Sequence, residues 1–211
     1  MRLRDLTGPV GRRLMTKWKV FGAHMVRKGY NLRNFGSLPN MLTLARLILT
    51  PVVITMVAAD RWVEAFAAFA LAGVTDALDG WLAKKFDLRT EIGAMLDPIA
   101  DKALLVSLYV ALGVAQAIPP ALAILVVSRD MMIVGGVVLA WVWDNPVKIR
   151  PLFISKANTA AQIAFVTAVL ASKAFGFSLG PFFPIGVWTV AALTLASAIA
   201  YLARWFKHMN L

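Results

Sequence analysis

Beyond residue 40 the chain alternates between long apolar segments and short polar connections. Six apolar segments can be counted, and each is close to the roughly 20 residues that an α-helix needs to cross a bilayer. They cover residues 41–58, 62–84, 92–115, 119–142, 153–172 and 184–205. The run Leu38-Pro39-Asn40 precedes the first segment, and Asn40 is the expected N-cap of its helix. The pattern predicts an all-α integral membrane protein with six transmembrane helices.

The segment before these helices has a different pattern. Residues 1–40 hold nine Lys and Arg residues against one acid, Asp5. Apolar residues recur among the charges at three- and four-residue spacing, which predicts a helix with one apolar and one cationic face. We therefore divide the chain into a basic amphipathic segment at residues 1–36, lying on an anionic membrane surface, and a transmembrane domain at residues 37–211. A solvated basic tail and a mitochondrial transit peptide are the alternatives for the first segment.

The composition supports this division and removes several classes of function. Hydrophobic residues make up 60% of the 211 residues, charged residues make up 16%, and the mean hydropathy is +0.72, whereas a typical soluble domain is about 25% charged. The chain has no cysteine, which excludes disulfides, thiolate metal sites and a cysteine nucleophile. Its two histidines lie near the chain ends, so a histidine metal site or a Ser-His-Asp triad is not expected.

The net charge of +11 accompanies apolar segments, which favours an anionic membrane over nucleic acid as the partner of the basic residues. Lys and Arg gather at one set of helix ends, in the N-terminal segment, the 84–89 loop, the 148–156 loop and the C-terminus. The opposite ends carry few cations. The positive-inside rule therefore predicts that both termini and the 84–89 loop lie on the cytoplasmic side of an inner membrane, or in the mitochondrial inner membrane of a eukaryote.

Within a stretch of 26 residues, four of the eleven acids lie inside the second and third apolar segments. Asp76 and Asp79 are three residues apart on one helix face, and Asp97 and Asp101 share a face of the next helix. A short loop joins the two helices, so we expect them to be antiparallel neighbours with their acidic faces together. A carboxylate inside a membrane segment is costly and normally faces a partner or a wet cavity, which marks this cluster as the functional site.

The acidic cluster needs cations, because four convergent carboxylates repel one another. Their oxygen donors favour a hard divalent ion, namely Mg²⁺, Mn²⁺ or Ca²⁺. Gly80, Ala83 and Gly93 lie on the same faces and leave room for a large polar ligand to approach the backbone. The residues alone leave two alternatives open: structural salt bridges with nearby lysines such as Lys102, and a cation transporter.

The acidic residues also carry a family resemblance. The run D-A-L-D-G-W-L-A-K at residues 76–84 is followed, after eight residues, by G-A-M-L-D-P-I-A-D at residues 93–101. This pattern is similar to the signature of the CDP-alcohol phosphotransferases, D-x2-D-G-x2-A-R-x8-G-x3-D-x3-D, at seven of its eight fixed positions. Lys84 stands where the family has Arg, and it offers phosphate a point charge instead of a bidentate fork. The resemblance covers residues 37–205 and implies six transmembrane helices and a homodimer.

The resemblance also implies a specific site. Two divalent ions, Mg²⁺ or Mn²⁺, would hold the diphosphate of CDP-diacylglycerol, and Asp101 would in addition be the general base for the acceptor hydroxyl. The metal ligands would be Asp76, Asp79, Asp97 and Asp101. The residues expected to contact the CDP-lipid are Asn40, Thr43, Gly80, Ala83, Lys84, Thr90 and Gly93.

The acceptor alcohol is not specified by this signature. Residues 40–46, 69–76 and 128–130 resemble the branch that holds phosphatidylglycerophosphate synthases and eukaryotic-type cardiolipin synthases. Within that branch, residues 150–162 are more similar to the cardiolipin synthase form, with Asn158 where the glycerophosphate enzymes more often have a second Lys. The expected acceptor is therefore phosphatidylglycerol, and glycerol-3-phosphate is the alternative.

Both acceptors are anionic phosphoesters, so a cationic patch would suit either of them. The candidates for binding the acceptor phosphate are Arg46, Arg129, Arg150 and Lys156. From the sequence, Arg46 could equally pair with an acid, and Arg150 and Lys156 could be cytoplasmic anchors of the membrane segments. Arg129 and Asp130 are adjacent, so their side chains are expected to point in different directions on a helix.

Overall fold

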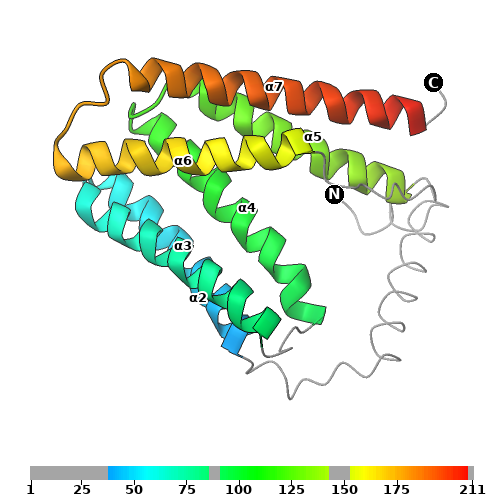
Figure 1. The fold of residues 1–211 in the computed structure, drawn as a ribbon, viewed down its shortest axis with the longest axis horizontal. Coiled ribbons are helices and arrows are strands. Elements are labelled where there is room, and N and C mark those ends of the chain that lie inside the picture. The colour runs from blue at the N-terminus through cyan, green and yellow to red at the C-terminus, as the bar shows by residue number, and fades with distance from the viewer. Residues whose placement is uncertain (1–37, 86–90, 143–152, 209–211) are drawn as a thin grey trace, which may run out of the picture. The chain divides into compact units, whose positions relative to one another are not determined.

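The computed structural model describes residues 38–85, 91–142 and 153–208, with side chains at 44–76, 78, 100–136 and 153–205 (Figure 1). All secondary structure in these ranges is helical: α2 (Leu38–Ala58), α3 (Trp62–Lys85), α4 (Glu91–Val114), α5 (Pro120–Val142), α6 (Phe153–Phe175) and α7 (Phe182–His208). The prediction that the six apolar segments are helices is confirmed, and each helix end lies within a few residues of its predicted position. The basic segment at residues 1–36 lies outside the described residues.

The start of α2 differs from the prediction. The helix begins at Leu38, so Asn40 is its third residue and is not the N-cap. Pro39 lies in the first turn, where a helix needs no backbone N–H donor, and the fixed φ of proline suits a helical start. The proline therefore belongs to the beginning of the helix and does not mark a break before it.

Short connections place consecutive helices in antiparallel order. In the first two connections within the described ranges, Asp60 and Gln116 adopt positive φ angles of 57° and 55°. Pro120 then begins α5, at a position where no backbone N–H is required. Between α6 and α7, the positive φ angles belong to Gly176 and Gly180, which adopt this backbone without steric cost. Each of these turns reverses the chain within a few residues.

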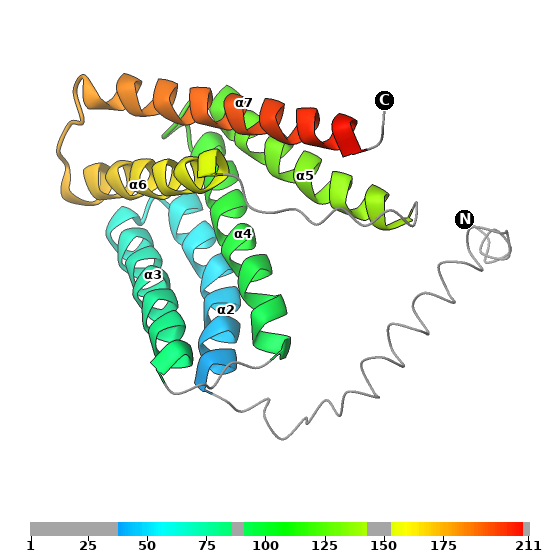
Figure 2. The ribbon, with the colours of Figure 1, turned by 45° about the vertical axis from the view of Figure 1, so that its right-hand side comes forward.

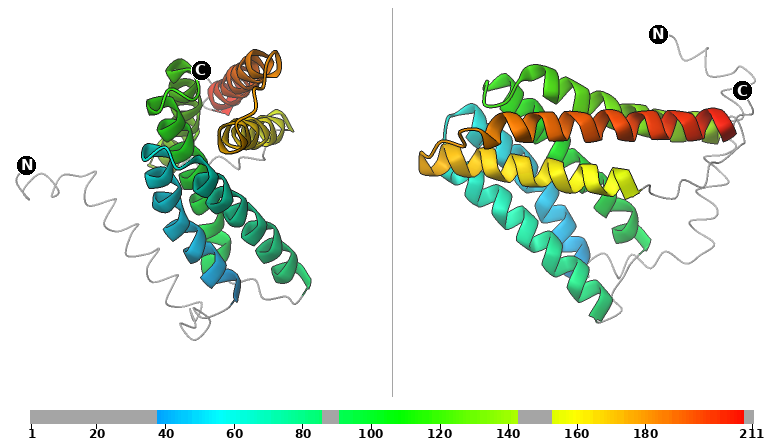
Figure 3. Two further views of the ribbon diagram at one scale, coloured as in Figure 1. Left: turned by 90° about the vertical axis from the view of Figure 1, so that its left-hand side faces the viewer. Right: turned by 45° about the horizontal axis from the view of Figure 1, so that its top comes forward.

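The helices form two groups of three. In the first group α2 packs against both α3 and α4 and lies between them, as Figure 2 shows. In the second group α7 packs against α5 and α6, and α6 and α7 run side by side (Figure 3). Contacts of α3 with α6 and of α4 with α5 join the two groups. The expectation that the helices carrying the acids are direct neighbours is therefore corrected, because α2 occupies the position between them.

The described apolar core lies toward one end of the helices, the end with the turns at Asp60, Gln116 and Gly176. Its main members are Val53, Val57, Phe69, Leu108, Leu112, Leu122, Val126, Val166, Val169 and Leu170. At the same end, the Lys173 ammonium lies 5.5 Å from the centre of the Trp62 ring, and the rings of Phe66 and Phe175 meet edge to face at 5.4 Å. These contacts hold the C-terminus of α6 against the N-terminus of α3. The core therefore lies away from the carboxylate motif, which is at the other end of α3 and α4.

Two of the described helices contain segments that are long and apolar enough to cross a membrane, Phe153–Phe175 and Phe182–Trp205. Many large apolar side chains on the described helices face outward, including Phe153, which is 86% exposed, and Trp188, which is 74% exposed. Extended exposed apolar surface is typical of a protein that contacts lipid or a partner. The all-helical fold fits a membrane protein, while six membrane crossings stay a prediction.

Candidate active site

The carboxylate motif occupies the ends of α3 and α4 that are remote from the core. Asp76 and Asp79 belong to α3, and Asp97 and Asp101 belong to α4. The side chains of Asp79 and Asp97 lie outside the described residues. The side chains of Asp76 and Asp101 are 50% and 48% exposed, so water and ions can reach both carboxylates.

Arg46 of α2 connects the two acidic helices. Its guanidinium forms an ion pair with Asp76, with Nη2 at 2.5 Å from Oδ1. It forms a second ion pair with Asp101, to which Nη1 also donates a hydrogen bond. The Arg46 side chain is only 1% exposed. Helix α2 thus places one buried cation between carboxylates from the two helices that flank it.

The sequence left two roles open for Arg46, binding of the acceptor phosphate and pairing with an acid, and this geometry distinguishes them. In the structure Arg46 is the partner of acids, and both of its described ion pairs go to the motif itself. The salt-bridge alternative for the motif is therefore present in part, but its cation is an arginine of α2. Lys102 pairs instead with Asp130 of α5, at 3.1 Å.

The donors present suit a divalent ion. Asp76 and Asp101 offer oxygen atoms, converge on Arg46 from two helices and keep half of their side chains accessible. Hard cations such as Mg²⁺ and Mn²⁺ prefer carboxylate oxygen. Among the described side chains no group of three metal-ligating residues is found, and two of the four motif acids fall outside that set. The donor chemistry fits the predicted metal site, with Asp79 and Asp97 as its further proposed ligands.

A second buried arginine lies in the other group of helices. Arg129 of α5 donates from Nε and Nη2 to the Ser197 hydroxyl of α7, at 3.2 and 2.5 Å, and from Nη2 to the Ser155 hydroxyl of α6, at 2.6 Å. Its Nη1 donates to Asp130 at 2.6 Å, and its guanidinium lies 5.7 Å from the centre of the Tyr201 ring. Arg129 therefore ties α5, α6 and α7 together.

Asp130 links this cluster to α4. Its carboxylate accepts from Arg129 and pairs with Lys102, which directly follows Asp101 in the chain. Asp130 is buried, whereas Lys102 is partly exposed. The expectation that Arg129 and Asp130 point in different directions is wrong, because the long arginine side chain reaches back to the neighbouring carboxylate. Arg129 and Lys102 therefore place two cations around the carboxylate of Asp130.

Neutral polar side chains continue the contact between α6 and α7 one helical turn from the two serines that hold Arg129. Asn158 is fully buried and accepts a hydrogen bond from the Thr194 hydroxyl at 2.9 Å. The side-chain amide of Gln162 donates to the same hydroxyl at 3.5 Å, and its backbone carbonyl accepts from the Tyr109 hydroxyl of α4 at 3.2 Å. Because Asn158 is neutral, position 158 adds no positive charge to the surroundings of Arg129.

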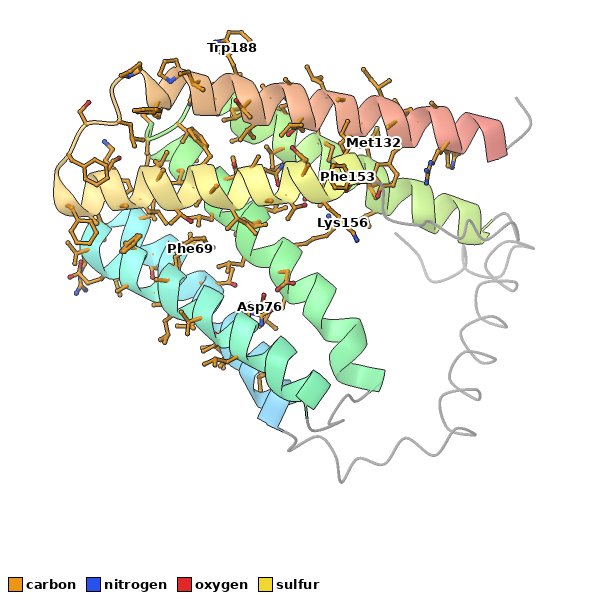
Figure 4. The ribbon with its side chains drawn as sticks, in the orientation of Figure 1. Phe69, Asp76, Met132, Phe153, Lys156 and Trp188 are labelled. Carbon is orange, nitrogen blue, oxygen red and sulfur yellow. The ribbon has the colours of Figure 1, made fainter. Side chains whose placement is uncertain are left out.

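The remaining predicted residues are described less fully. Lys156 is exposed on α6, and in Figure 4 it projects from the side of that helix on which Asp76 also lies. Thr90 and Arg150 lie outside the described residues. For the rest of the CDP-lipid set the structure describes helix positions but no side chains: Asn40 and Thr43 in α2, Gly80, Ala83 and Lys84 in α3, and Gly93 in α4.

The sequence did not indicate the partners of the two buried arginines. Ser155 and Ser197, which hold Arg129, lie in apolar helices, and nothing near them in the chain marks them as its partners. The pairing of Lys102 with Asp130 crosses from α4 to α5. A charged residue deep in an apolar segment signals that a partner exists, but it does not name that partner.

The acids on α3 and α4 belong to the signature noted in the sequence. Comparison with known proteins identifies the family that carries this signature. The chain matches the CDP-alcohol phosphatidyltransferase family over residues 36–207. This match covers most of the chain, so the chain belongs to that family. Membership places it among the transferases and confirms the resemblance that the acidic signature indicated.

Three relatives show the range of named activities in the family. The chain is 35% identical over 185 residues to the chloroplastic CDP-diacylglycerol–glycerol-3-phosphate 3-phosphatidyltransferase 1 of Oryza sativa subsp. japonica, covering 79% of this chain and 56% of the relative. It is 36% identical over 182 residues to the cardiolipin synthase (CMP-forming) of Homo sapiens, covering 78% of this chain and 60% of the relative. It is 30% identical to the CDP-diacylglycerol–glycerol-3-phosphate 3-phosphatidyltransferase of Bacillus subtilis, covering 80% of this chain and 94% of the relative.

These alignments place the chain in the family without selecting one acceptor. The chain spans less than two thirds of the rice and human relatives and nearly all of the Bacillus relative. Identity to the two kinds of enzyme is almost equal. The choice of acceptor must therefore come from the chemistry of particular residues.

Proposed function

We propose that the protein is a cardiolipin synthase, which transfers the phosphatidyl group of CDP-diacylglycerol to a hydroxyl of phosphatidylglycerol and releases CMP. Family membership supports the transfer chemistry, and the human relative carries this name. The observation that carries the choice of acceptor is Asn158. It is neutral, fully buried and one turn from the serine that holds Arg129.

The neutral side chain at position 158 bears on the acceptor because the two candidate acceptors carry different charges. A phosphomonoester such as glycerol-3-phosphate carries about −1.5 to −2 at neutral pH, whereas the phosphodiester of phosphatidylglycerol carries a single negative charge. A lysine at position 158 would match the larger charge. An asparagine that is hydrogen-bonded to Thr194 leaves one cation fewer near Arg129, which favours the singly charged diester.

The donor side of the site is assigned to α3 and α4. We propose that Asp76, Asp79, Asp97 and Asp101 hold two Mg²⁺ or Mn²⁺ ions, and that the CDP-lipid is contacted by Asn40, Thr43, Gly80, Ala83, Lys84, Thr90 and Gly93. When bound, such ions neutralise a diphosphate and stabilise the CMP leaving group. The accessible carboxylates of Asp76 and Asp101 support this assignment, and so does the absence of bulky side chains at positions 80, 83 and 93.

Asp101 is the proposed general base. As the acceptor hydroxyl oxygen forms a bond with the phosphatidyl phosphorus, the bond from that phosphorus to the CMP oxygen breaks, and CMP leaves with the electron pair. The hydroxyl proton passes to the Asp101 carboxylate, which must lie within hydrogen-bond reach of that hydroxyl. Its half-exposed position on α4 supports access by an acceptor from outside the bundle.

The acceptor phosphate is assigned to the cationic side of the bundle, at Arg129, Arg150 and Lys156. The excess of cations in the group formed by Arg129, Asp130 and Lys102 supports this assignment. Arg46 was part of the same predicted group, but both of its described ion pairs go to motif acids. Arg46 would bind phosphate only after those ion pairs separate.

We further propose that the protein acts as a homodimer in an anionic inner membrane, with its site and both termini on the cytoplasmic side. The connections that carry Asp60 and Gln116 lie at the end remote from the acids, as does the last turn of α6 with Lys173. This supports one common side for the motif and the basic loops. The basic amphipathic segment at residues 1–36 would bind anionic lipid on that side.

The second candidate function is that of a CDP-diacylglycerol–glycerol-3-phosphate 3-phosphatidyltransferase. The observation that favours it is the Bacillus relative of that name, of which the alignment covers 94%. The donor chemistry is the same in both cases, and the two functions differ in the acceptor alone.

One assay separates the two functions. The purified protein receives CDP-diacylglycerol and Mn²⁺ with phosphatidylglycerol or glycerol-3-phosphate in parallel, and CMP release is measured. We expect turnover with phosphatidylglycerol to be much faster, and Asn158→Lys to shift the ratio of kcat/KM values toward glycerol-3-phosphate. Faster turnover with glycerol-3-phosphate in the wild-type protein would overturn the cardiolipin synthase proposal in favour of the second candidate.

A further inference from the structure

Arg46 is a buried cation at a site that we propose to bind metal cations. Its guanidinium is buried behind the motif, while the two carboxylates that it contacts are half exposed in front of it. The partners come from different helices, α3 and α4, and α2 supplies the cation between them. Arg46 therefore contacts the same carboxylates that the proposed function assigns to metal ions.

Electrostatics explains why such a residue is needed. Asp76 and Asp101 both carry negative charge in the metal-free protein, and two like charges held close together disfavour the packing of α3 and α4 around α2. A buried arginine is always charged and forms strong hydrogen bonds to carboxylates. Among the described side chains, one cation for two acids lowers the repulsion but leaves an excess of negative charge, which attracts a further cation.

We propose that Arg46 is a positioning residue that acts as the built-in counter-cation of the metal site. In the metal-free protein it holds the carboxylates of Asp76 and Asp101 together, and divalent ions compete with it for them. This inference rests on the proposed metal-dependent function. It goes beyond that function by assigning a role to a residue that is not a metal ligand and that reduces the affinity for the metal.

Comparison with Arg129 shows why Arg46 is more than a structural ion pair. Arg129 is enclosed by two serine hydroxyls and a buried carboxylate. The carboxylates that face Arg46 remain open to water over half of their side chains. An ion pair that served packing alone would be stronger with enclosed acids, because exposure of the carboxylates weakens the pair.

The first experiment tests the counter-cation role without metal. Thermal unfolding is measured in a chelator for the wild-type chain, Arg46→Gln, Asp76→Asn/Asp101→Asn and the triple variant. Arg46→Gln should lower the Tm by several degrees because it removes the buried cation between two carboxylates. The same change in the background that lacks both acids should cost much less, so the cycle should show coupling. Equal losses in the two backgrounds would overturn the proposal.

The second experiment tests competition. Binding of Mn²⁺ is titrated by electron paramagnetic resonance of the free ion, without substrates. Loss of a contacting positive charge should tighten Mn²⁺ binding by about tenfold or more in Arg46→Gln, and Arg46→Lys, which keeps the charge, should stay close to wild type. Arg61→Gln removes an arginine from the exposed pair with Glu64 and should change neither Mn²⁺ affinity nor Tm.

The outcomes separate this inference from the proposed function. Mn²⁺ affinity that is unchanged or weaker in folded Arg46→Gln would overturn the competition. If Mn²⁺ fails to bind even the wild-type chain, while the chelator cycle still shows coupling, the metal-dependent function and the competition both fail. Only the stabilising pairing of Arg46 with the two carboxylates then stands. Tighter binding together with coupling supports both the inference and the metal site.

Discussion

Arg46 and Arg129 are two buried arginines with opposite surroundings in the two helix groups. Arg46 contacts two carboxylates that are half exposed. Arg129 is held by Ser155, Ser197 and the buried Asp130. Among the described side chains, the cluster around Arg46 has two acids for one cation, whereas the cluster of Arg129, Lys102 and Asp130 has two cations for one acid. The excess charge is negative where we propose metal ions and positive where we propose a phosphate.

The physical lesson concerns charge balance inside an apolar bundle. A charge that is removed from water interacts strongly with its neighbours. An excess of one charge sign in a cluster therefore favours binding of a ligand of the opposite sign. An arginine by itself does not indicate a binding site. The number of acids around it and their exposure to solvent indicate whether the site attracts a cation or an anion.

The largest expected effect that separates the two clusters comes from Asp101→Asn. This change keeps the shape of the side chain and removes the proposed base, so kcat should fall by about 10²–10⁴-fold, while binding of CMP is partly retained. The measurement is CMP release at saturating CDP-diacylglycerol, with CMP affinity determined separately. Turnover within tenfold of wild type in a folded Asp101→Asn protein would contradict the assignment.

Asp130→Asn should act on stability and on the acceptor, because it removes the one acid of the cationic group. Breaking a buried ion pair costs about 3 kcal/mol or more, and Arg129 and Lys102 would then lose their common partner. The measurements are the free energy of unfolding in detergent, KM for phosphatidylglycerol and Mn²⁺ affinity. The first two should worsen and Mn²⁺ affinity should stay unchanged. A large change in Mn²⁺ affinity would show that the two clusters are not independent.

Gly186→Ala tests whether the Arg129 cluster depends on the packing of α6 against α7. A Cβ at Gly186 would lie 2.5 Å from Cδ2 of the buried Phe165 ring, and such overpacking costs about 1–3 kcal/mol. Gly135→Ala is the matched control, because its Cβ would meet nothing within 4 Å. Thermal unfolding should show a loss for Gly186→Ala alone. Equal stability of the two variants would mean that the ring moves aside freely.

Lys102→Gln should have the smallest effect. Lys102 is partly exposed beside Asp130, and exposed ion pairs contribute about 1 kcal/mol or less. We expect a small loss of stability and a modest rise in KM for phosphatidylglycerol, both weaker at high salt because salt screens exposed charges. Titration at low and high ionic strength checks this. A loss as large as that of Asp130→Asn would place Lys102 inside the buried unit.

Local sequence was sufficient for the helices and for the positions of the acidic motif on two of them. The six apolar segments, their ends and the placement of four acids on α3 and α4 follow from hydrophobic length and from three- and four-residue spacing. Family membership followed from the same acidic spacing, at seven of eight fixed positions. These features depend on residues close together in the chain, where helix geometry alone relates one side chain to the next.

Tertiary structure decided which helices are neighbours and therefore which charges meet. Chain order suggested that α3 and α4 pack directly together, but α2 lies between them and brings Arg46 to both acids. The serines that hold Arg129 come from α6 and α7, far along the chain from α5. Helical periodicity says which face of a helix is polar, but the partner of that face is chosen by packing among all the helices. The sequence therefore revealed that Arg46 and Arg129 need partners, and the fold alone determined that one meets acids and the other hydroxyls.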